Sequence, residues 1–289
     1  MGHQKGIYKD SRPVFKVLQW MVAVCVLTIL AAMLLYVIQY IGGISPDNIH
    51  YIKSVQALQT ISVFLLPPLV VAYLWSGQPC RYLRLQGSSC PTAVWWLVPL
   101  SILVAAPGIN LLAYLNQQLA LPAFLQPLED LMKQLEQQAE TLTLRFLQVK
   151  SFGALLINLF VMALLPAIGE ELTFRGLLLR RVTHVTIWAV AILFAAIHLQ
   201  FYGFVPRMLI GAYLGYLLLW TNSLWAPILA HFTNNALAVI VSFFAYRYSE
   251  DTTMLESFGT ENTLWAGILS LCLTVLLIGY IRKIATSNS

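Results

Sequence analysis

Polar and ionisable side chains that could do chemistry are concentrated in one part of an otherwise apolar sequence. Residues 170–175 read Glu-Glu-Leu-Thr-Phe-Arg, and His198 and His231 follow on later apolar segments. Asn235 stands one helical turn after His231. A carboxylate beside an imidazole can activate water as a general base, and a second imidazole with an amide can stabilise an oxyanion.

Spacing gives the two adjacent carboxylates different roles. Glu171 and Arg175 are four residues apart, so they share one helix face and can form an ion pair. Glu170 is rotated by about 100° from Glu171 and remains free to face a cavity. Taken singly, a His or Asn in such a segment is more often a hydrogen-bonded structural residue. The functional interpretation therefore depends on several such groups meeting at one depth.

Helix geometry places these groups at a similar depth. Glu170 and His198 each lie 14 residues from His184, in the turn expected between their segments, or about 20 Å at 1.5 Å per residue. Arg207 and Asn235 fall about 20 Å from the next turn by the same rise. Ionisable groups inside membrane segments are costly, so this common layer predicts a functional site.

Three chemistries fit such a layer. Two His with one or two Glu could hold zinc, although the sequence has no HExxH motif and no Cys nearby. A metal-free carboxylate and imidazole could instead activate water for peptide hydrolysis, without a cofactor. The same groups could also serve ion-coupled transport or hold a regulatory scaffold together. Serine-type and aspartyl-type intramembrane proteases are disfavoured, because GxSxG and an embedded Gly-Asp pair are missing.

Composition identifies the elements that must position these residues as membrane helices. Of the 289 residues, 59% are hydrophobic and 10% are charged, with a mean hydropathy of +0.74. Soluble domains carry roughly 25% charged residues. A soluble enzyme, a disordered chain and a nucleic-acid binder are therefore excluded. The four Cys form no CxxC pair, so neither a disulfide framework nor a zinc ribbon is expected.

The sequence predicts an all-α polytopic membrane bundle of about eight transmembrane helices. A span needs about 20 mostly apolar residues, and the first run lacks the pattern of a cleaved signal peptide. We expect a single domain over 1–289, with its motif core at about 165–240 and the bilayer as its environment. The apolar runs lie at about 14–41, 55–75, 93–115, 151–168, 186–204, 206–221, 224–246 and 263–281.

Basic residues favour both termini in the cytoplasm, in what we expect to be a bacterial inner (cell) membrane. Most of the 17 Lys and Arg fall on one side of this topology, as the positive-inside rule requires. They are Lys5, Lys9, Arg12, Lys16, Arg81, Arg84, Arg175, Arg180, Arg181, Arg282 and Lys283.

Residues 116–150, between the third and fourth spans, predict an extracytoplasmic amphipathic helix. The segment is rich in Gln and acidic residues, and its apolar residues recur only at helical spacing. Such a helix can rest on lipid headgroups or on the bundle, which we favour. The alternative is a lid over a cavity that opens outward.

Three motifs in order resemble a known family. Residues 170–175 match EExxxR, 194–198 match FxxxH, and 231–235 match HxxxN. On successive helices they resemble the CAAX proteases and bacteriocin-processing enzymes, or Abi family, whose eukaryotic members are the type II CAAX prenyl endopeptidases. The resemblance covers about 165–240.

The resemblance implies an eight-helix intramembrane endopeptidase that cleaves a peptide or a membrane protein. Carried over by motif, Glu170 is the general base on water, aided by His198. His231 and Asn235 then stabilise the oxyanion, and Glu171 with Arg175 supports the site. The resemblance favours a glutamate mechanism over zinc, and a prenylated substrate is not carried over.

Overall fold

Helices built from the apolar runs make up the fold, in a computed structural model that describes residues 6–119, 121–248 and 257–287. Lys5 and residue 120, which belong to the predicted N-terminal and amphipathic segments, lie outside these residues. The described residues form helices and turns without a strand, which confirms the predicted all-α class. The helices are α1 (Pro13–Gly42), α2 (Ile49–Thr60), α3 (Leu66–Trp75), α4 (Pro79–Tyr82), α5 (Thr92–Gln117), α6 (Gln126–Leu147), α7 (Phe152–Asn158), α8 (Leu165–Glu171), α9 (His184–Ala196), α10 (Phe204–Thr221), α11 (Trp225–Tyr248) and α13 (Leu264–Thr286).

Seven helical stretches in the described residues are long and apolar enough to cross a membrane. The one remaining predicted segment, 186–204, contains only the 13-residue helix α9. At 1.5 Å per residue α9 reaches only about 20 Å, against about 30 Å for a hydrocarbon core. The helix ends because the chain turns at Leu199, whose φ is 54°. The protein is thus an integral membrane protein with one shortened helix.

Wide π-helical turns join α2 to α3 and α7 to α8. The segments Ile61–Leu65 and Leu159–Leu164 each come just before a proline in the next helix, Pro67 and Pro166. Proline has no N–H to give to the preceding turn, and π-bulges accommodate such a lost bond. A third π-helical segment, Leu172–Leu178, begins directly after Glu171. The helix that carries both carboxylates is therefore irregular on either side of them.

Small residues bring the helices around the site close together. A Cβ at Gly169 would lie 3.1 Å from Phe64 Cβ, and one at Gly215 would lie 2.8 Å from Ile187 Cγ2. The first contact joins α8 to the segment between α2 and α3, and the second joins α10 to α9. Such close packing at Gly169 and Gly215 is expected where packing drives helix association in lipid.

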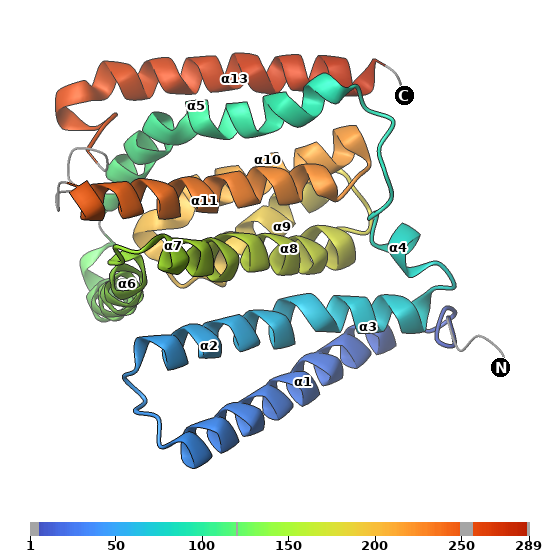
Figure 1. Cartoon of the computed structure of the whole chain (residues 1–289). Helices are drawn as coiled ribbons and strands as arrows, with labels where there is room; N and C mark the ends of the chain where they lie inside the picture. The colour runs from blue at the N-terminus through green and yellow to red at the C-terminus, as the bar shows by residue number, and fades with distance from the viewer. Residues whose placement is uncertain (1–5, 120, 249–256, 288–289) are drawn as a thin grey trace.

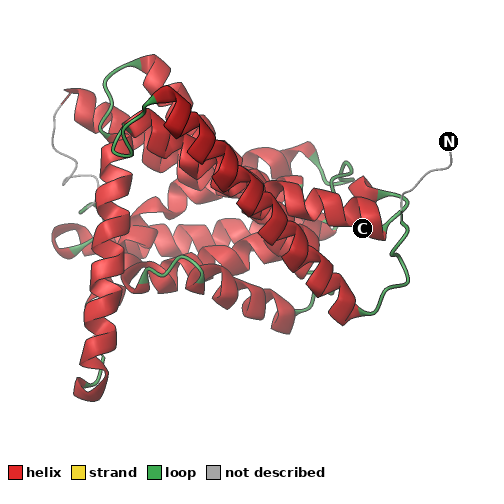
Figure 2. Cartoon of the chain, turned by 90° about the horizontal axis from the view of Figure 1, so that it is seen from below, coloured by secondary structure: helices red, strands yellow, loops and turns green. Residues whose placement is uncertain are grey.

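The helix α6 lies across one end of the bundle. In Figure 1 it is seen end-on while the spanning helices run across the view, and Figure 2 shows it running past their ends. Its C-terminal end is held by buried groups: the Asn158 amide and Lys53 Nζ both donate to the Phe146 carbonyl, at 2.6 and 3.5 Å. The predicted amphipathic helix is therefore present and fixed to the bundle.

Candidate functional site

A buried ion pair forms the base of the site. Arg175 Nη1 donates to Glu171 Oε1 at 2.8 Å, and both side chains are fully buried. Arg175 Nη2 also donates to the Gly211 carbonyl at 2.8 Å, which ties the helix of the carboxylates to α10. The ion pair predicted from the four-residue spacing is present. Glu171 is fully buried and does not line the inner cavity described below, so the ion pair supports the site and does not face a substrate.

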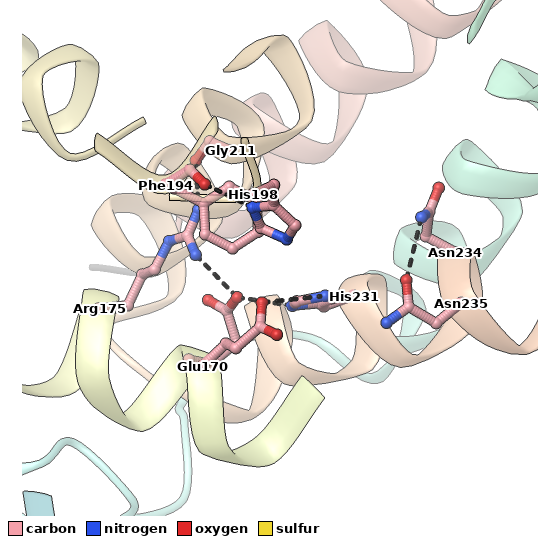
Figure 3. Close-up of polar contacts among 9 residues, drawn as sticks. Glu170, Arg175, Phe194, His198, Gly211, His231, Asn234 and Asn235 are labelled. Atoms are coloured by element: carbon pink, nitrogen blue, oxygen red, sulfur yellow. Dashed lines mark hydrogen bonds and ion pairs between the residues drawn. The ribbon is translucent and has the colours of Figure 1, made fainter. Parts of the chain in front are cut away.

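His231 lies between the two carboxylates. Its Nδ1 is 2.8 Å from Glu171 Oε1, and its Nε2 is 3.9 Å from Glu170 Oε2. Glu171 Oε1 accepts from Arg175 Nη1, and as an acceptor it takes a second hydrogen bond from His231 Nδ1. Figure 3 shows the His231 ring beside Glu170. His231 Nε2 is thereby directed to the cavity beside Glu170.

Glu170 is the carboxylate that faces the cavity. Its side chain is 14% exposed, whereas that of Glu171 is not exposed at all. In the described part of the chain, Glu170 Oε2 is buried without a hydrogen-bond partner. A buried acceptor without a partner is costly, so it can be expected to bind a polar ligand such as water.

His198 faces the same cavity from another element. It follows the end of α9, and its Nδ1 donates to the Phe194 carbonyl at 2.7 Å. This hydrogen bond fixes the tautomer and makes Nε2 an acceptor. The described residues show no hydrogen bond or ion pair between His198 and Glu170. The imidazole that contacts Glu170 is instead His231.

Asn235 extends the row of polar groups along α11. It lies one turn after His231, and its Oδ1 accepts from Asn234 Nδ2 at 3.2 Å. Because Oδ1 is occupied, the Asn235 amide is left with N–H groups to donate. In Figure 3 the side chain lies on the far side of His231 from Arg175. His231 and Asn235 therefore face the same cavity from successive turns of α11, as their i,i+4 spacing predicts.

One cavity of about 390 Å³, called here the inner cavity, is shared by the predicted site residues. The common layer predicted from helix lengths is thus present. The lining includes Glu170, His198, Arg207, His231, Asn234 and Asn235.

A second cavity of about 850 Å³, called here the vestibule, lies between α6, the start of α10 and the middle of α11. Its α6 wall is polar, with Lys133, Glu136 and Gln137. Glu129 also turns inward and accepts from Lys133 Nζ at 2.8 Å and from the Leu121 N–H at 3.0 Å. These two bonds hold the pKa of Glu129 below its usual range. The structure thus places α6 over a cavity, although whether it moves as a lid stays a prediction.

Two residues that contact the site side chains, Phe194 and Gln200, were given no role from the sequence. The Phe194 ring lies 4.6 Å from the Arg175 guanidinium carbon and packs edge-on against His198 and His231, at 5.0 and 5.8 Å between centroids. Its place four residues before His198 is the signal that could have identified it. Gln200, which binds Arg207, gave no such signal, because a lone Gln in a turn has no distinctive pattern.

Comparison with known proteins concerns the part of the chain that holds this site. Residues 152–237 match a family described as type II CAAX prenyl endopeptidase, Rce1-like. Over 83 residues the chain is 34% identical to the uncharacterized protein YpbD of Bacillus subtilis (strain 168), a stretch that is 27% of this chain and 42% of that protein. The chain thus matches less than half the length of this curated relative. No solved structure matches it.

Proposed function

We propose that this chain, which belongs to the CAAX protease family through residues 152–237, is an intramembrane peptide hydrolase. The observation that supports the proposal most is the inner cavity, where an unpartnered carboxylate oxygen, two imidazoles and an amide face a common space. We propose a peptide or a membrane protein as substrate, with the bacterial cell membrane as location and both termini in the cytoplasm.

Glu170 is the proposed general base. Its Oε2 can accept a hydrogen bond from a water molecule, because no described side chain satisfies it. Proton transfer to a positioned carboxylate contributes typically 10²–10⁴-fold in rate. His198 Nε2 is a second acceptor that faces the same cavity, and it orients the water and shares its proton.

His231 and Asn235 are the proposed donors to the oxyanion. This role requires a proton on His231 Nε2, which lies 3.9 Å from Glu170 Oε2, in addition to the proton on Nδ1 that Glu171 accepts. Asn235 Nδ2 supplies a second donor from the same helix face. Negative charge that develops on the substrate carbonyl oxygen would be stabilised by these two donors in a water-poor site.

The proposed reaction requires no metal. In the described part of the chain, no three His, Cys, Asp or Glu side chains converge in a way that could hold an ion. The donor set therefore fits acid–base chemistry better than zinc ligation.

A substrate trap tests the proposed function. Glu170→Gln keeps the shape of the side chain but removes the base, so the variant should bind substrate without cleaving it. Proteins that co-purify with Glu170→Gln are identified by mass spectrometry and then incubated with the wild-type protein. Asp130→Asn, on the exposed side of α6, is the matched control and should retain no substrate. Trapped proteins that the wild type leaves intact would contradict the proposal.

A further inference from the structure

The vestibule and the inner cavity meet at two side chains. Among the described residues, Arg207 and Asn235 are the ones that line both cavities. A substrate segment that passes beneath α6 to reach Glu170 must therefore pass the Arg207 guanidinium. Asn235 has a proposed role in the reaction, whereas Arg207 has none.

Arg207 has neutral protein partners. Its Nη2 donates to Gln200 Oε1 at 2.5 Å, and its Nη1 donates to the Gln200 carbonyl at 3.5 Å. No ion pair with a carboxylate is present in the described residues. The two acids that face it are engaged elsewhere: Glu136 accepts from the Tyr202 N–H at 3.0 Å, and Glu170 faces His231.

The charge of Arg207 is not explained by its structural contacts. Binding Gln200 requires only a hydrogen-bond donor, which a neutral side chain could supply. Neither Glu136 nor Glu170 forms an ion pair with Arg207 in the described residues, and the guanidinium lines both cavities, so its charge is available to a ligand of opposite charge. The guanidinium is also a planar fork that matches a carboxylate in a bidentate pair.

We propose that Arg207 is a specificity-determining residue that binds a carboxylate of the substrate at the neck between the two cavities. This inference rests on the proposed function. The carboxylate belongs to an Asp or Glu side chain or to a free C-terminus, and it lies on the α6 side of the scissile bond. The amides of Gln117, Gln137 and Gln200 line the vestibule and can bond an extended polar backbone there.

Peptide binding to the inactive protein tests the inference without requiring cleavage. Random dodecapeptides are made with a C-terminal acid and with a C-terminal amide, and those retained by purified Glu170→Gln are identified by mass spectrometry. A charge-assisted pair predicts enrichment of carboxylate-bearing peptides by about tenfold or more. Enrichment of the acid form alone identifies a C-terminal carboxylate. Enrichment of Asp or Glu at one position in both forms identifies a side chain.

Substitutions at Arg207 complete the test. In the Glu170→Gln background, Arg207→Gln should abolish the enrichment. Arg145→Gln, which removes a charge from α6 outside both cavities, should preserve it. Arg207→Lys keeps the charge but loses the fork, and should retain part of the preference. Absence of any carboxylate enrichment, or its persistence in Arg207→Gln, overturns the inference. Enriched peptides that the wild type does not cleave would contradict the proposed function and leave this inference intact.

Discussion

Glu170 and Glu171 are neighbours in sequence with opposite surroundings. Glu171 Oε1 accepts from Arg175 and His231 and its side chain is fully buried, whereas no hydrogen bond to Glu170 is found among the described residues and its side chain lines the inner cavity. The rotation of about 100° between successive helical residues is sufficient to place one carboxylate in the core and the other in a cavity. One residue therefore supports the site while the other is available for the reaction.

His198 should matter for the reaction and little for the fold. It has one described hydrogen bond, to the Phe194 carbonyl, and its other nitrogen faces the inner cavity. We expect His198→Ala to slow turnover strongly while its melting temperature stays close to that of the wild type. Peptide cleavage and a melting curve on the same preparation check this. A variant that melts much lower but cleaves normally when folded would make His198 a structural residue.

Arg175 should matter mainly for stability. Removing one partner of a buried ion pair costs about 3–5 kcal/mol, because the other charge remains buried without its partner. We therefore expect Arg175→Met to lower the melting temperature strongly, and the double variant with Glu171→Gln to recover part of the loss. Lys133→Met removes the half-exposed lysine of another i,i+4 pair, whose Glu129 keeps its bond from the Leu121 N–H, and should lower the melting temperature much less. A double variant no more stable than Arg175→Met would contradict this account.

Helix lengths and apolar runs could be predicted from the sequence, but local irregularities could not. Seven of the eight apolar segments form spanning helices where hydropathy places them, and so does the amphipathic helix α6. The end of α9 at Ala196 was not predictable, because apolar residues recur as far as Phe201, with only His198 and Gln200 between them. The π-helical turns were equally hidden, since one extra residue in a wholly apolar run leaves its hydropathy unchanged.

For the site, too, contacts within one helix could be predicted from the sequence, whereas contacts between helices could not. Spacing within a helix predicted the Glu171–Arg175 pair, because both residues share one local geometry. The contact of His231 with both carboxylates was not predicted, since it depends on how α11 rotates against α8. The pairing of Glu170 with His198 was predicted from their common depth in the membrane alone. Depth does not determine which way each side chain points around its helix axis.

Acid should loosen the N-terminal end of α6. The pKa of Glu129 is held below its ordinary value of 4.5 in the folded protein by bonds from Lys133 and Leu121. The resulting stabilisation is therefore complete above about pH 4.5 and is lost as pH falls through the folded pKa. We expect hydrogen exchange in α6 to rise in that window, and Glu129→Gln to exchange fast already at pH 7. An unchanged exchange pattern in Glu129→Gln would exclude this role.

At the scale of the whole molecule, one short helix explains how water can reach a site inside a membrane bundle. The chain beyond α9 turns back at membrane depth, which is tolerated only where backbone is buried or lines a polar cavity. The vestibule beneath α6 occupies this end of the bundle and joins the inner cavity at Arg207 and Asn235. The architecture therefore supplies both a polar route to Glu170 and an apolar exterior for lipid.

The most direct test of the account is the cleavage rate of Glu170→Gln on a trapped substrate, compared with the wild type and Asp130→Asn. Loss of the general base predicts a fall in kcat of about 10²–10⁴-fold, with melting temperature and substrate binding retained. Asp130→Asn should cleave at the wild-type rate, and a chelator should leave the wild-type rate unchanged. A folded Glu170→Gln protein that cleaves as fast as the wild type would contradict the central claim that Glu170 activates water.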